Sequence, residues 1–194
     1  MNKLLFFIFA LIATVGGSIA FVACDDANSN NEDSVENAQD INKEKDIEKD
    51  KSNFMTKAAS SGMFEVKVGE WAAQKGSTPV VKTFGAQMVA DHSKANAELQ
   101  ALGQSENVTL PGDMGKDYQD KYDDLAKKSG KDFDEAYMDL MKKEHKNDVD
   151  MYEDYAEDED SDMEVRAFAQ KYLPILKSHH TKAESGEEHT DKAH

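Results

Sequence analysis

The strongest constraint on the fold is a run of apolar residues at intervals of three and four, repeated along residues 53–183. This spacing places apolar side chains on one face of an α-helix, whose period is about 3.6 residues. No segment alternates apolar and polar residues with the period of two that a half-buried β-strand requires. The sequence therefore predicts an all-α fold.

Four such stripes predict four long helices, over residues 53–74, 79–103, 132–157 and 162–183. Ser77 or Thr78 is the candidate N-cap of the second helix, and Pro79 suits its first turn because the missing N–H donor is not needed there. We expect Asp132 to cap the third helix. Pro174 should bend the fourth, since proline removes a backbone hydrogen bond.

A loop over residues 105–114 and a short helix over residues 116–128 separate the second and third long helices. Two helical hairpins joined by such a crossover make a four-helix bundle. We expect this bundle to span residues 52–183. Residues 184–194 are predicted to be a flexible polar tail, because they offer little apolar surface to dock.

Residues 1–23 carry a positive Lys3 and then a long apolar run, which is the pattern of a secretory signal peptide. The run ends with Ala23 before Cys24, which resembles the bacterial lipobox, although Phe21 stands where leucine is usual. We therefore predict cleavage before Cys24 and its lipidation. An uncleaved membrane helix is the alternative, because about 20 apolar residues span a bilayer.

Residues 24–51 are expected to form a disordered acidic tether. Residues 25–51 hold ten acidic residues against four lysines and few large apolar side chains. Such a composition buries too little surface to offset the entropy lost on ordering. The chain would then be anchored by lipid in the bacterial cell envelope, in the outer membrane, with the periplasmic or surface side left open.

The formal net charge of −16 constrains the partners. A field of this sign repels a phosphate backbone, so nucleic-acid binding is not expected. It attracts cations and basic surfaces, and a cationic or protein partner in the envelope fits it. No nucleophile elbow, phosphate loop or dinucleotide fingerprint is present, so no catalytic residue is predicted.

One ionisable residue lies on the apolar stripe of each long helix, and these residues are Glu65, His92, His145 and His179. A charged group in a core must be paired, neutral or metal-bound. Inward ligands from the four helices of a bundle can form a metal site, and imidazoles with a carboxylate suit zinc, iron or copper. The alternative is a structural cluster of hydrogen-bonded polar residues in a non-catalytic interaction or stress-protective module.

Three acidic residues near these positions are secondary candidates, namely Asp91, Glu144 and Asp148. Met88 and Met141 each precede a histidine by one turn, an arrangement that suits copper or, as a weaker option, haem. Dinuclear iron bundles instead use Glu-x-x-His, and this motif is absent before His92 and His145.

An ordered series of segments resembles the family of unknown function DUF4142, at residues 58–66, 81–84, 88–96, 132–138, 145 and 173–179. The resemblance implies a ferritin-like bundle in an exported protein and no established activity. It also marks five motif positions, which are Glu65, Asp91, His92, His145 and His179.

Mass spectrometry of the mature amino terminus tests the predicted anchor. We expect the chain to begin at an acylated Cys24, because the buried acyl chains supply the membrane affinity. An intact chain with an unmodified Cys24 would exclude the lipoprotein prediction.

Overall fold

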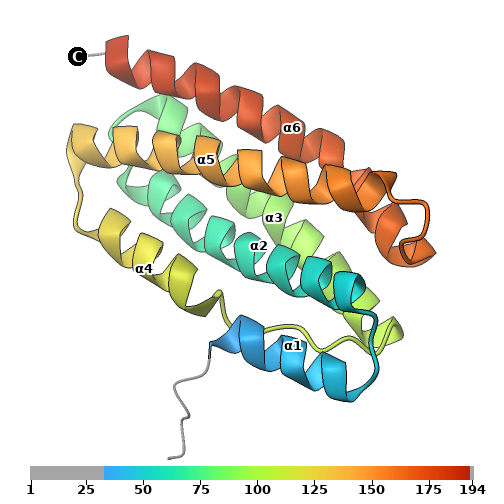
Figure 1. Cartoon of the computed structure of the whole chain (residues 1–194). Helices are drawn as coiled ribbons and strands as arrows, with labels where there is room; N and C mark the ends of the chain where they lie inside the picture. Colours follow the sequence, from blue (N-terminus) through green and yellow to red (C-terminus); the bar gives the residue numbers. More distant parts are fainter. Residues whose placement is uncertain (1–32, 193–194) are drawn as a thin grey trace, which may run out of the picture. The chain divides into compact units, whose positions relative to one another are not determined.

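The structure is a computed structural model that describes residues 33–192, with side chains as far as residue 186, and every element in that range is an α-helix (Figure 1). The helices are α1 (Ser34–Glu44), α2 (Lys49–Lys75), α3 (Pro79–Ser105), α4 (Gly115–Ala126), α5 (Gly130–Glu157) and α6 (Met163–Lys192). The four longest correspond to the four predicted stripes, and α4 corresponds to the predicted crossover helix. The predicted all-α bundle is confirmed.

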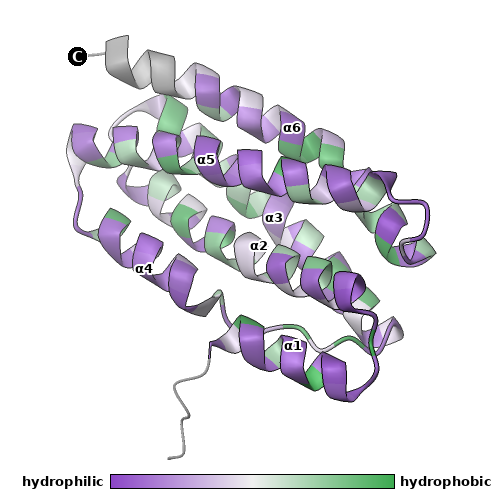
Figure 2. Cartoon of the chain, viewed as in Figure 1, coloured by the Kyte–Doolittle hydropathy of each residue, from purple (hydrophilic) through white to green (hydrophobic). Residues whose placement is uncertain are grey.

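The long helices form two hairpins, α2 with α3 and α5 with α6, and α4 connects them (Figure 1). The hairpins pack together through α2 against α5 and α3 against α6. Gly69 and Gly85 let α2 and α3 approach closely, because a Cβ on either would meet the backbone carbonyl of the other. Figure 2 shows hydrophilic and hydrophobic residues interspersed along each helix, as expected for helices with one buried face.

The turn between α2 and α3 is fastened to α5 by a buried carboxylate. Asp134 accepts hydrogen bonds from the Ser77 N–H, the Ser77 hydroxyl and the Thr78 N–H, each at 2.8 Å. Thr78 caps α3 as predicted, by accepting from the Val81 N–H. The prediction that Asp132 caps α5 is wrong, because α5 begins earlier, after Ser129, and Asp132 lies in its first turn.

The predicted disordered tether is wrong for residues 33–51, which α1 and the first turn of α2 largely occupy. Asp33 caps α1 by accepting from the Val35 N–H at 2.8 Å. Asn42, fully buried, donates to the Thr109 carbonyl at 2.9 Å and accepts from the Thr109 N–H at 2.6 Å. These long-range bonds, together with the buried Ala38 side chain, hold the acidic segment against the bundle. Residues 24–32 of the predicted tether, and Cys24 with them, lie outside the described residues.

The predicted polar tail is helical as far as Lys192, because α6 continues through it. Ala183 is buried, and a Cβ on Gly186 would meet the Met138 side chain, so this end of α6 packs on α5. Pro174 lies inside α6 without ending it. The bend expected at that proline stays a prediction.

Two apolar clusters fill the core, and buried polar residues lie between them along the helices. On α3, Ala95 and Leu99 belong to the first cluster and Met88 to the second. His92 lies between them, and on α6 His179 lies in the same way between Leu176 and Ala183. We call this intervening set the polar layer, and its buried members are Ser61, Glu65, His92, Glu144, His145, Asp148 and His179.

No helix among the described residues is long and apolar enough to cross a membrane.

The substitution Asn42→Ala should destabilise the bundle by about 1–3 kcal/mol, because it leaves the partly buried N–H and C=O of Thr109 without their Asn42 partner. Urea unfolding followed by circular dichroism measures this change. Asn37→Ala, an exposed position on the same helix, is the matched control and should change the free energy of unfolding little. Equal effects of the two substitutions would show that α1 is not held through Asn42.

Candidate metal centre

Each long helix places one predicted ligand in the polar layer. Glu65 on α2, His145 on α5 and His179 on α6 are all 0% exposed, and His92 on α3 is 5% exposed. The helix period explains this convergence, since each residue lies on the apolar stripe of an antiparallel helix at similar height. The structure therefore brings together the four residues that the sequence singled out.

The three imidazoles form the tightest part of the group. One ring nitrogen from each of His92, His145 and His179 lies within 4.8 Å of the other two. The ring centroids are 5.2–5.5 Å apart, and none of the three ring pairs is parallel. Zinc–imidazole bonds of about 2.0–2.1 Å bring two nitrogens to within about 4.2 Å of each other, so a small inward shift of the three rings lets their nitrogens share one ion.

Glu65 lies beside this trio and contacts two of its members. Its Oε2 is 2.9 Å from His92 Nδ1, and its Oε1 is 3.3 Å from His145 Nε2. Burial alone would raise the pKa of Glu65, but its interactions with the adjacent imidazoles, above all His92, outweigh burial and hold that pKa below its usual value. Glu65 is therefore the negative charge of the centre.

The hydrogen bond on the far side of His145 determines which ring nitrogen faces Glu65. His145 Nδ1 lies 2.8 Å from the Met141 carbonyl, which can only accept, so Nδ1 carries the proton. Burial lowers the pKa of His145, which favours the neutral ring. In that form Nε2 presents a lone pair toward the Glu65 carboxylate. Two acceptors then face each other across 3.3 Å.

His179 is held in a related way from the surface side. Its Nε2 lies 2.9 Å from Oδ2 of Asp91, a carboxylate that is itself 37% exposed. Burial lowers the pKa of His179 to about 4, so the ring is neutral at pH 7 and donates Nε2–H to Asp91.

Several polar atoms of the centre have no hydrogen-bond partner among the described residues. They are Nε2 of His92, Nε2 of His145 and Nδ1 of His179. Leaving a buried polar atom unpaired costs about 1–3 kcal/mol and more when the group is charged. Several unpaired polar atoms, each with such a free-energy cost, therefore lie close together in the polar layer.

The secondary candidates occupy different places. Burial, together with the charge of Glu65, raises the pKa of Asp148 well above its ordinary value, and the two carboxyl groups can share the proton. Glu144 is buried but turns to α4, where its Oε2 accepts from Lys121 Nζ at 2.9 Å. Asp91 contacts His179 at 2.9 Å and lies outside the trio. Met88 and Met141 are fully buried in the second apolar cluster, as core residues of that spacing commonly are.

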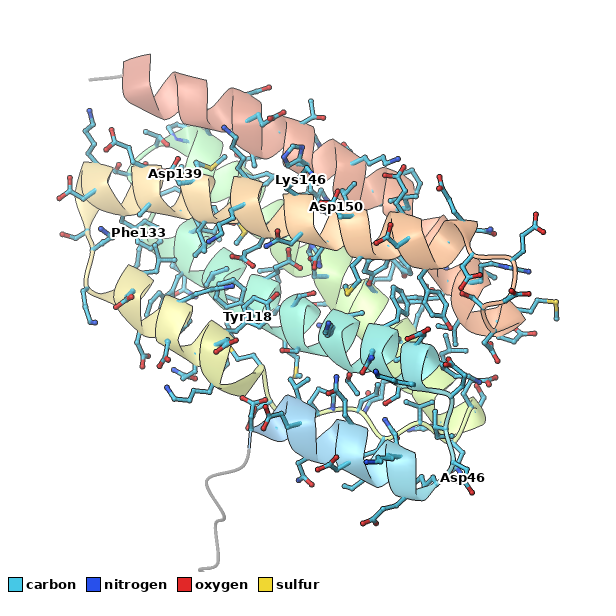
Figure 3. The ribbon with its side chains drawn as sticks, viewed as in Figure 1. Asp46, Tyr118, Phe133, Asp139, Lys146 and Asp150 are labelled. Carbon is cyan, nitrogen blue, oxygen red and sulfur yellow. The ribbon has the colours of Figure 1, made fainter. Side chains whose placement is uncertain are left out.

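Sequence reasoning missed the part that α4 plays around the centre. Tyr118, labelled in Figure 3, stacks on Phe64 with ring centroids 4.7 Å apart, and the Lys121 ammonium lies 4.4 Å from the Tyr118 ring centroid. Burial and the nearby Asp148 and Glu65 charges raise the pKa of Tyr118. The apolar spacing of α4 predicted a helix. The sequence did not indicate that this helix lies next to the acidic residues of the polar layer, where Lys121 pairs with Glu144.

A family model described as a domain of unknown function, DUF4142, matches residues 36–185. The matched range contains all members of the polar layer, and it confirms the resemblance found in the sequence. No curated protein and no solved structure matches the chain.

Asp148→Asn should change how stability depends on pH in the metal-free protein. The pKa of Asp148 is raised in the folded state from its ordinary value of 3.8, so the stability that its protonated form contributes is complete below that pH and is lost as the pH rises. The loss has a limiting slope of roughly 1.4 kcal/mol per pH unit. Asparagine does not titrate, so the variant lacks this loss of stability. The variant should therefore become more stable relative to the parent as the pH rises from 4 to 7.

Urea unfolding at a series of pH values measures this difference. Asp150→Asn is the matched control, because Asp150 is exposed on the same helix and pairs with Lys146 (Figure 3). A stability difference between Asp148→Asn and the parent that stays constant with pH would contradict the assignment of a buried, protonated carboxyl.

Proposed function

The chain belongs to the DUF4142 family, and we propose that it is a lipid-anchored protein of the bacterial envelope whose helical bundle binds a transition-metal ion. Glu65, His92, His145 and His179 are the proposed ligands. Binding of the ion in this way suits its storage, delivery or sensing. The membrane partner is reached through the lipid on Cys24.

One observation carries the metal-binding proposal, namely the convergence of three buried imidazoles whose ring nitrogens Nε2 of His92, Nε2 of His145 and Nδ1 of His179 have no hydrogen-bond partner among the described residues. The Glu65 carboxylate lies beside them, with its oxygens 2.9 Å from His92 Nδ1 and 3.3 Å from His145 Nε2. Nε2 of His145 must offer its lone pair toward the same carboxylate, since Nδ1 is bound to the Met141 carbonyl. Acceptors that face one another in an apolar core call for a cation between them.

A proton on an imidazole is the competing source of positive charge. It is disfavoured at two of the three rings, because burial lowers the pKa values of His145 and His179. A metal ion instead bonds directly to the imidazole lone pairs and to the carboxylate, and so supplies positive charge without protonating a ring. Three nitrogen donors and one carboxylate oxygen form a donor set that suits zinc, iron or copper.

The proposed location rests on the amino-terminal pattern of residues 1–24. A lipidated Cys24 would place the bundle at a membrane surface, and the acidic chain would attract cations there because its net charge is −16. Envelope proteins meet metal ions outside the cytoplasm, which agrees with a metal-binding bundle at that surface.

Metal analysis of the full chain, purified in detergent without a histidine tag, tests the function. We expect close to one equivalent of zinc, copper or iron per chain, with a higher melting temperature when that ion is added. A ligand at 100 times its dissociation constant stabilises a protein by about 2.7 kcal/mol. His179→Ala and Glu65→Gln should lose the bound metal and the shift in melting temperature.

His180→Ala is the matched control, since His180 is the next residue on α6. Among the described residues its one ion pair is with the Glu184 carboxylate, at 3.8 Å. This variant should retain the metal. The proposal is contradicted if the parent chain contains no bound metal and its melting temperature does not change when zinc, copper or iron is added. The polar layer would then have a structural role.

A further inference from the structure

Asp91 stands between the surface of the bundle and the buried centre. It is the partner of His179 across the α3–α6 contact, with His179 Nε2 at 2.9 Å from its Oδ2. The aspartate is partly exposed, while the histidine is buried. The pair thus joins a solvated carboxylate to a ring whose other nitrogen lies in the core.

We propose that Asp91 is a positioning residue that holds His179 in the Nε2–H tautomer and thereby presents the Nδ1 lone pair to the metal ion. This inference rests on the proposed function, because it assigns the ligand atom of His179. It also implies mixed ligation, with Nδ1 used by His179 and Nε2 by His145.

The tautomer follows from the donor and acceptor inventory of the pair. A neutral imidazole has one N–H and one lone pair, and a carboxylate only accepts. Nε2 must therefore be the donor toward Asp91, and the lone pair must lie on Nδ1. That Nδ1 has no hydrogen-bond partner in the described part of the chain, and His179 lies beside His92 and His145 at centroid distances of 5.3 and 5.2 Å.

Two further side chains hold Asp91 in place. Gln87, one turn earlier on α3, donates through Nε2 to Asp91 Oδ2 at 3.2 Å. Lys182 on α6 donates to Gln87 Oε1 at 2.9 Å. These hydrogen bonds connect Lys182 on α6 to Gln87 and Asp91 on α3, and Asp91 in turn contacts His179 on α6. Hydrogen-bonded carboxylates of this kind fix the ring orientation of metal-ligating histidines and raise their basicity.

The fold offers a matched control for the substitution Asp91→Leu. Glu98 also lies on α3 and also pairs with α6, through Lys171 at 2.5 Å. Glu98→Leu removes a carboxylate bridge between the same two helices without touching a histidine. Asp91→Asn provides a graded variant, because its amide oxygen still accepts a hydrogen bond but carries no charge.

The first measurement is nitrogen NMR on the metal-free full chain in detergent, labelled with ¹⁵N-histidine. The parent and Glu98→Leu should show His179 as a single Nε2–H tautomer. Asp91→Leu should lose that single tautomer, whereas a merely structural contact would leave the ring shifts of His179 unchanged. An unaltered Nε2–H tautomer in Asp91→Leu, or its absence in the parent, overturns the proposal.

The second measurement is zinc affinity, obtained by competition with a chromophoric chelator. We expect zinc to bind about 10–100-fold more weakly to Asp91→Leu, with Asp91→Asn between it and the parent and Glu98→Leu equal to the parent. Equal affinity in Asp91→Leu and Glu98→Leu overturns the positioning role. A parent that binds neither zinc nor another of the three ions contradicts the proposed function, and the tautomer measurement still decides the role of Asp91.

Discussion

The burial of Glu65 among three imidazoles is the interaction on which the rest of this structure depends. A carboxylate that is 0% exposed is costly unless positive charge is supplied beside it. The histidines come from three other helices, so this requirement couples the two hairpins at one level of the core. The apolar clusters on either side shield the group from solvent and strengthen every charge interaction within it.

The surrounding structure contributes by bringing the helices to the right separation. Gly69, one turn beyond Glu65, meets Gly85 and allows α2 and α3 to lie close together. Asp134 fastens the α2–α3 turn to α5, and Lys121 on α4 neutralises one oxygen of Glu144 near the centre. Each contact joins segments far apart in the chain, so the arrangement of the ligands belongs to the whole bundle rather than to any one helix.

The polar layer divides into groups with different tasks. His92, His145 and His179 carry lone pairs, Glu65 carries the negative charge, and Asp148 is kept protonated by its burial beside Glu65. Because one carboxyl retains its proton, the layer avoids a second unpaired negative charge in the core. The two neighbouring carboxyl groups therefore differ in protonation because their surroundings differ: Glu65 is an anion and Asp148 is a neutral acid.

The sequence by itself determined the helices and which side of each faces the core, because the helical period makes both a local property. It also singled out Glu65, His92, His145 and His179, since ionisable residues on an apolar stripe break the pattern. It misjudged residues 33–51, which were expected to be disordered. Asp33, Val35 and Glu36 form a helix-start pattern there. The bonds from Asn42 to Thr109, which hold the segment in place, join residues far apart in the chain and are not visible in the sequence.

Only the tertiary structure decided which atoms meet: Glu65 with two imidazoles, Asp91 with His179, and Glu144 with Lys121. Partners that lie on different helices depend on the rotation and height of each helix, and these are set by packing across the whole core.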